Sequence, residues 1–275
     1  MTATTPPPPA AAGGQPVIGP QPSSAATTGG VGGAALLVVG TRRGLWRGVQ
    51  LLVAGLLVLV GAAAAGQALN EAAGWWMVDG ALVDLGTLGV IGWLLRRDHR
   101  SYRGLLGPPT TAWQVALGGL GVLAASVPAV VFSGQLTSAI YGQDAIPPMF
   151  AVADLPPWAS VVSVLVVPLL AELAEPVAYL GVVLPRLEKR IGRSWMAALI
   201  VVALWAAEHA LYPLLVSGGG LDLEFAAYRV GSVLPFLATW TAAYYALGRR
   251  LLPIMAARWV FNGGSALALA LGLVA

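Results

Sequence analysis

The residues of this chain that could do chemistry are ionisable and amide side chains set inside long apolar stretches. They are Glu172, Glu175, Glu208, His209, Arg258 and Asn262. Together, an acid, an imidazole, a guanidinium and an amide could form a hydrolytic site. The carboxylate would take a proton from water, the imidazole would help to hold that water, and the Arg and Asn donors would stabilise an oxyanion.

The spacing of these residues indicates which of them share a helix face. Glu172 and Glu175 are three residues apart, and Arg258 and Asn262 are four apart, so on helices each pair shares one face. Glu208 and His209 are neighbours and lie about 100° apart around a helix. At most one of these two therefore points straight at a given site.

The composition places these residues in a membrane protein. Of the 275 residues, 57% are hydrophobic and 10% are charged, whereas soluble domains carry about 25% charged residues. This excludes an ordinary soluble protein and predicts an all-α, polytopic transmembrane helical bundle. We expect an integral protein of a bacterial plasma membrane whose surroundings are the lipid bilayer, with no nucleic-acid partner. The absence of cysteine excludes disulfides and thiolate chemistry.

About seven stretches reach the roughly 20 apolar residues that a membrane span needs. They cover residues 45–68, 75–95, 112–133, 159–185, 195–216, 225–247 and 251–273. Residues 1–40 are rich in Pro, Ala and Gly and predict a disordered tail, so the transmembrane domain covers residues 41–275. Nearly all of the 15 basic residues lie before the first span or after the second, fourth and sixth. The positive-inside rule then predicts a cytoplasmic N-terminus.

The depth of the polar residues in these spans can be compared. At about 1.5 Å per residue from the cytoplasmic ends, Glu175 lies about 15 Å deep, His209 about 21 Å, Arg258 about 11 Å and Asn262 about 17 Å. These four residues could therefore meet near the middle of the membrane. Each buried charge needs a partner or a wet cavity, because a charge at mid-bilayer costs roughly 2.5–3.5 kcal/mol.

Three motifs in the second half of the chain resemble those of the CPBP family, the CAAX-protease and bacteriocin-processing type of intramembrane protease. The resemblance covers about residues 159–265, and it rests on Ala174, Glu175, Gly181, Leu184, Pro185, Arg186 and Leu187 in the first motif, Trp205, His209 and Pro213 in the second, and Asn262 in the third. It implies that Glu175 and His209 activate a water molecule and that His209 and Asn262 help to form an oxyanion site.

The chain departs from the family pattern at three motif positions. The first motif of the family is E-E-x-x-x-R, but Pro176 replaces its second Glu and Leu180 replaces its Arg. Arg258 stands where the third motif has His, and it can neither act as a base nor bind a metal. Pro176 is expected to kink the helix beside Glu175. Glu172, one turn earlier, is a candidate to replace the missing carboxylate.

The resemblance implies an endopeptidase that hydrolyses a peptide bond of a membrane-associated peptide or protein. One alternative is a catalytically degenerate member of the family that acts as a binding, immunity or scaffold protein. Its charges would form a buried network in which Arg258 neutralises Glu175 or Glu172, and His209 bonds to Glu208 or a backbone carbonyl. A second alternative is a small ion- or proton-coupled transporter.

Zinc stays open as a cofactor, with Glu175 and His209 as its ligands. One histidine with glutamates is a thin ligand set, and the sequence has no H-E-x-x-H motif. Whether the substrate is prenylated and which oligomeric state the chain adopts do not follow from the sequence.

Overall fold

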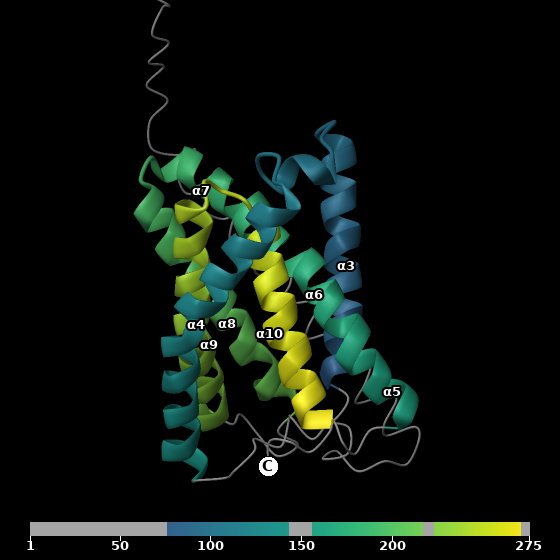
Figure 1. Ribbon diagram of the computed structural model, residues 1–275, viewed down its shortest axis with the longest axis vertical. Helices are drawn as coiled ribbons and strands as arrows, with labels where there is room; N and C mark the ends of the chain where they lie inside the picture. The colour runs from purple at the N-terminus through teal and green to yellow at the C-terminus, as the bar shows by residue number, and fades with distance from the viewer. Residues whose placement is uncertain (1–75, 143–155, 217–222, 271–275) are drawn as a thin grey trace, which may run out of the picture.

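The computed structural model describes residues 76–142, 156–216 and 223–270, and all regular elements in these ranges are helical. The tail predicted over residues 1–40 and the span predicted over 45–68 lie outside the described residues. Each of the other six predicted spans coincides with a helix (Figure 1). By length and composition, the helices over Ala112–Tyr141 and Val162–Ile191 are apolar enough to cross a membrane.

Helices α3 (Trp76–Arg97) and α4 (Ala112–Tyr141) precede the segment that carries the motifs. A short 3-10 helix, η1 (Tyr102–Leu105), lies between them. Helix α4 begins at a capping box in which Thr111 and Gln114 bond to each other's backbone N–H groups. It runs eight residues beyond the expected end at 133 and stops at Gly142, whose φ is +92°.

The fourth predicted span corresponds to one continuous helix, in which two π-helical segments interrupt the α-helical geometry. It consists of α5 (Pro157–Val161), η4 (Val162–Val166), α6 (Val167–Pro176), η5 (Val177–Val183) and α7 (Leu184–Ile191). Pro176 lacks the N–H that would donate to the carbonyl four residues earlier. The helix accommodates this proline where α6 gives way to the π-helical η5, and such π segments often accompany functional sites.

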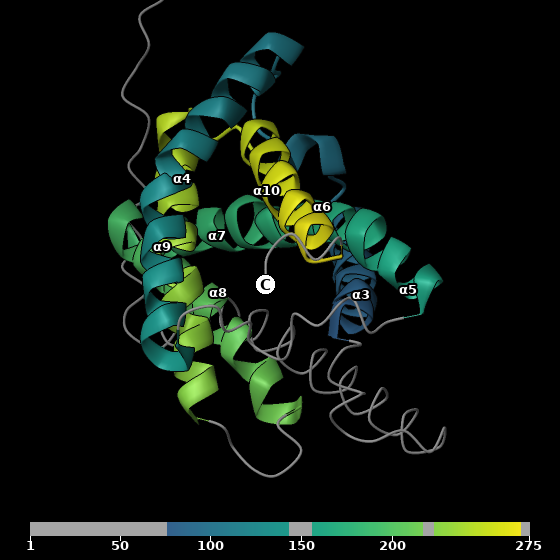
Figure 2. The ribbon, with the colours of Figure 1, turned by 60° about the horizontal axis from the view of Figure 1, so that its bottom comes forward.

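The remaining helices are α8 (Ser194–Val216), α9 (Leu223–Ala246) and α10 (Leu252–Ala270). Helix α8 packs on α9, α3 packs on α6, and α10 lies between α4 and α6 (Figure 2). The shared core contains fully buried side chains from the second half of the chain, among them Tyr179, Leu180, Leu184, Trp205, Leu237 and Ile254. Many large apolar side chains of α3, α4 and the stretch from α5 to η4 instead point outward and are exposed, as expected of a surface that faces lipid.

The three basic connections of the described chain meet at one end of the bundle (Figure 1). Arg186 pairs with Asp98 at 3.0 Å, and Arg249 binds Glu188 through two contacts of 2.6 and 2.9 Å. Hydrogen bonding to Glu188 raises the pKa of Arg249 above its ordinary value. This arrangement agrees with the alternation from which the orientation was predicted. The span count and the cytoplasmic N-terminus stay predictions.

Gly107 lies where the connection before α4 touches the connection between α9 and α10. Its φ is +90°, and a Cβ at this position would lie 2.1 Å from the carbonyl oxygen of Arg249. The Leu251 N–H donates to the Leu106 carbonyl at 3.0 Å next to this contact. Residue 107 must therefore lack a side chain.

We expect Gly107→Ala to destabilise the protein by about 1–3 kcal/mol, because a left-handed non-glycine residue and a backbone clash are combined there. Thermal unfolding in detergent measures the loss. Gly104→Ala is the matched control, since its added Cβ would meet only the Ser101 hydroxyl at 3.5 Å. Equal unfolding temperatures for the two variants would contradict the proposed packing.

Candidate active site

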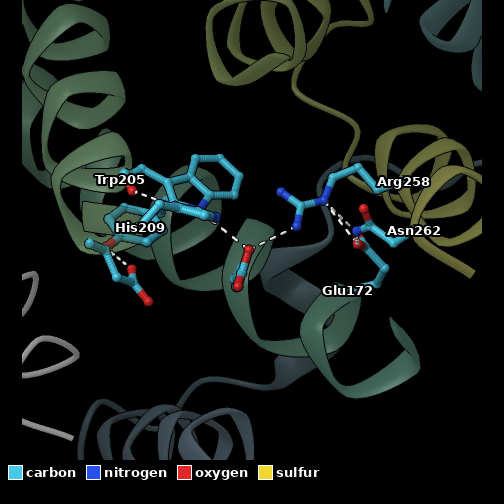
Figure 3. Close-up of polar contacts among 8 residues, drawn as sticks. Glu172, Trp205, His209, Arg258 and Asn262 are labelled. Carbon is cyan, nitrogen blue, oxygen red and sulfur yellow. Dashed lines mark hydrogen bonds and ion pairs between the residues drawn. The ribbon is translucent and has the colours of Figure 1, made fainter. Parts of the chain in front are cut away.

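Arg258 of α10 reaches across to α6 and binds both of its glutamates (Figure 3). Its Nε donates to the two carboxylate oxygens of Glu172 at 2.9 and 2.8 Å, and its Nη2 donates to Glu175 Oε2 at 2.8 Å. Asn262, one turn further along α10, donates its amide to Glu172 Oε1 at 2.9 Å. The expected pairing of Arg258 with these glutamates is therefore confirmed, and it involves both at once.

The two carboxylates differ in their surroundings. The side chain of Glu172 is only 3% exposed and accepts three hydrogen bonds, two from Arg258 and one from Asn262. The side chain of Glu175 is 15% exposed. Its Oε2 accepts from Arg258 and, at 3.4 Å, from the indole N–H of Trp205. Glu175 is therefore the more accessible of the two carboxylates.

Two tryptophans lie against the guanidinium of Arg258. Its Cζ is 4.9 Å from the ring centroid of Trp205 and 4.4 Å from that of Trp240, and such cation–π contacts gain strength when they are desolvated. Trp240 in turn donates its indole N–H to Ser126 of α4 at 3.2 Å. Helices α4, α8 and α9 thus help to fix an arginine that comes from α10.

One nitrogen of Arg258 remains available for a further contact. The side chain is 3% exposed, and its Nη1 is buried without a hydrogen-bond partner among the described residues. A buried donor left unsatisfied costs about 1–3 kcal/mol, and more when it is charged. An anionic group that accepted a hydrogen bond from Nη1 would recover this cost.

His209 is connected to this ion pair through Trp205, which lies between them (Figure 3). Its Nδ1 is 2.9 Å from the carbonyl oxygen of Trp205, one turn earlier on α8. Because a carbonyl oxygen only accepts, Nδ1 must donate, and a neutral imidazole then has its lone pair on Nε2. Of the two hydrogen-bond partners expected for His209, the structure shows the backbone carbonyl, while Glu208 interacts with it electrostatically.

Glu208 faces a different neighbour from His209, as the 100° between them requires. Its carboxylate is 5% exposed and accepts a hydrogen bond from the hydroxyl of Tyr179. Arg229 of α9 interacts electrostatically with Glu175 and with His209.

Direct contacts thus join Glu172, Glu175, Arg258 and Asn262, whereas His209 joins them through Trp205. The contributions of Tyr179 and Trp240 were not foreseen from sequence. The i, i+4 spacing of Glu175 and Tyr179 was a usable signal. For Trp240, on a separate helix, the sequence offered no comparable signal.

The donor set fits a metal ion poorly. In the described parts of the chain, no three His, Asp or Glu side chains come together as a group that could hold one. Of the two candidate zinc ligands, Glu175 already binds a guanidinium at 2.8 Å. The cation of Arg258 at that carboxylate would repel a second cation.

The two residues that depart from the first motif of the family, Pro176 and Leu180, are both buried. Leu180, at the position of the family arginine, is fully buried in the apolar core, and Pro176 is buried at the end of α6. Glu172 and Arg258, which lie outside these two positions, bind each other at 2.8 Å. Gly181 lies in a close contact, because a Cβ there would be 3.3 Å from the Leu105 carbonyl oxygen.

Comparison with known proteins identifies the region that carries this site. Residues 157–264 match a family model described as type II CAAX prenyl endopeptidase, Rce1-like. No curated protein and no solved structure matches the chain. The match begins in α5 and ends in α10, so it includes the two glutamates of α6, His209, Arg258 and Asn262. Over residues 157–264, this chain is therefore similar to the Rce1-like type II CAAX prenyl endopeptidases.

Proposed function

We propose that the protein is an intramembrane endopeptidase that hydrolyses a peptide bond of a membrane-associated peptide or protein. The observation that carries this proposal is the arrangement around Arg258. Its Nη2 binds Glu175, the accessible carboxylate, while its buried Nη1 has no partner among the described residues. A candidate base and a candidate oxyanion donor are thus joined by one rigid, planar group.

In the proposed reaction, Glu175 takes a proton from a water molecule as the water oxygen attacks the peptide carbonyl carbon. His209 holds this water through its Nε2. Negative charge develops on the carbonyl oxygen, and Arg258 Nη1 and the second amide hydrogen of Asn262 stabilise it. The C–N bond then breaks, and the proton held by Glu175 passes to the leaving amine. The products are a new carboxylate and a new amine.

In this proposal Glu172 has a supporting role. It accepts three hydrogen bonds and is almost fully buried, so it has little capacity left to bind water. Its charge instead keeps Arg258 and Asn262 in place. A carboxylate–arginine pair at positions 172 and 258 would thereby replace the pair that the family has in its first motif.

A second candidate function is a family member that binds a membrane peptide or protein without cleaving it. The 2.8 Å ion pair between Arg258 and Glu175 favours this candidate, because a carboxylate engaged by a guanidinium is less available to accept a proton. The two functions differ in whether the bound peptide is hydrolysed.

Reconstitution tests the proposal. The purified protein in liposomes is incubated with membrane-anchored peptides, with and without a prenyl group, and the products are identified by mass spectrometry. We expect wild type to cleave at a defined bond and Glu175→Ala and His209→Ala to fail. Peptides that are retained by wild type but never cleaved would support the binding function, and cleavage by all three proteins would refute the assigned site.

A further inference from the structure

Tyr179 and Glu208 form a buried pair beside the site that the proposed reaction does not use. Tyr179 is 1% exposed and Glu208 is 5% exposed, and the phenol donates a hydrogen bond to the carboxylate. Burying a carboxylate in an apolar core is costly. A phenylalanine beside an apolar residue would fill the same space without that cost, so the polar pair calls for an explanation beyond packing.

Tyr179 connects this pair to Trp205. The two rings are stacked, with centroids 4.9 Å apart and an angle of 13° between their planes. Trp205 is fully buried and also lies against the guanidinium of Arg258. Because the hydrogen bond to Glu208 fixes the position of the phenol, it also restricts how the stacked indole can tilt.

Trp205 makes one contact with each of the two groups proposed to activate water. Its indole N–H donates to Glu175, and its carbonyl oxygen accepts from His209 Nδ1. The indole bond, at 3.4 Å, is longer than the 2.7–3.2 Å usual for N–H···O bonds. At this length a small rotation of the indole is enough to break it. The position of Trp205 therefore controls a contact of Glu175.

We infer that Tyr179 and Glu208 are positioning residues, which hold the indole of Trp205 where it orients Glu175. Neither residue contacts the reacting atoms in the proposed reaction. The effect of this pair on catalysis rests on the proposed function. Its effect on the position of the Trp205 indole can be measured without any substrate.

The structural test follows the indole N–H of Trp205 by 15N NMR of the protein in detergent, with Trp205→Phe used to assign its resonance. We expect this resonance to shift in Tyr179→Phe, which keeps the stacked ring, and in Glu208→Gln, which keeps an acceptor oxygen. The matched control is Tyr245→Phe. Tyr245 also donates to a glutamate, Glu188, at 2.9 Å, but at the end of the bundle where the basic connections meet.

An unmoved Trp205 resonance in both Tyr179→Phe and Glu208→Gln would overturn the inference, as would an equal shift in Tyr245→Phe. Using both variants keeps the test valid if one of them does not fold. This outcome is independent of catalysis. If wild type cleaves no peptide but the resonance shifts as expected, the proposed function fails and the positioning role of the pair stands.

Where wild type cleaves a peptide, the kinetic constants provide a second test. Small misplacement of a reacting group can lower the rate by up to about 100-fold. We therefore expect kcat of Tyr179→Phe to fall about 10- to 100-fold with KM unchanged, while Tyr245→Phe keeps the wild-type kcat. A change in KM alone, or wild-type kinetics in Tyr179→Phe, would contradict a positioning role.

Discussion

Arg258→Leu is expected to destabilise the protein by about 3–5 kcal/mol, the loss typical when one partner of a buried ion pair is removed. Both carboxylates of α6 would lose their guanidinium, and Glu172, at 3% exposure, would keep no ion-pair partner among the described residues. Unfolding in mixed detergent, followed by circular dichroism, measures the loss. The contacts with Trp205 and Trp240 disappear as well, which adds to it.

Arg249→Leu is the control for this prediction. Arg249 also makes two bonds to one glutamate, but its side chain is 45% exposed, and an exposed pair contributes only about 0.2–1 kcal/mol. The double variant Arg258→Leu/Glu172→Leu should regain much of the lost stability, because replacing a whole buried pair by apolar residues is often neutral. A loss in Arg258→Leu no larger than in Arg249→Leu would contradict the buried network.

The helices of this protein were predictable because their apolar lengths are set by the thickness of a bilayer. The stretches 195–216 and 225–247 correspond closely to α8 and α9. The end of α4 was predicted at residue 133, yet the helix continues for eight more residues to Tyr141. This added stretch contains polar side chains, but its backbone stays helical as far as Gly142.

The site was predictable where contact depends on spacing within one helix and on depth in the membrane. Glu172 and Glu175 share a face, and Arg258 and Asn262 share another, so the meeting of α6 with α10 brings all four together. The link from His209 to Glu175 depends instead on Trp205 of α8, whose indole reaches Glu175 on α6. The stacking of Tyr179 on Trp205 joins α8 to the π-helical segment η5, and the sequence does not reveal a π segment.

The second large effect is expected from Glu175→Gln. The substitution preserves size and an acceptor oxygen for Arg258, but an amide cannot take a proton from water. General-base catalysis contributes typically 10²- to 10⁴-fold, so we expect the cleavage rate to fall by about that factor with no loss of folding. Single-turnover cleavage of the best peptide substrate in liposomes measures the rate.

Glu172→Gln is the matched variant for this comparison, since it makes the same chemical change three residues away. Its carboxylate is saturated by Arg258 and Asn262, so we expect a smaller loss of rate than in Glu175→Gln. A larger loss in Glu172→Gln would mean that Glu172, and not Glu175, acts as the base.

If Glu175 activates the water that attacks the peptide bond, the oxygen atom of that water becomes part of the new carboxylate. Wild type and Glu175→Gln are incubated with a membrane-anchored peptide in 18O-labelled water, and the fragments are analysed by mass spectrometry over time. We predict that wild type produces a fragment with one 18O atom in its new carboxylate, whereas Glu175→Gln produces at most a hundredth of it in the same time. Equal amounts of labelled fragment from both proteins, or none from wild type, would contradict the claim.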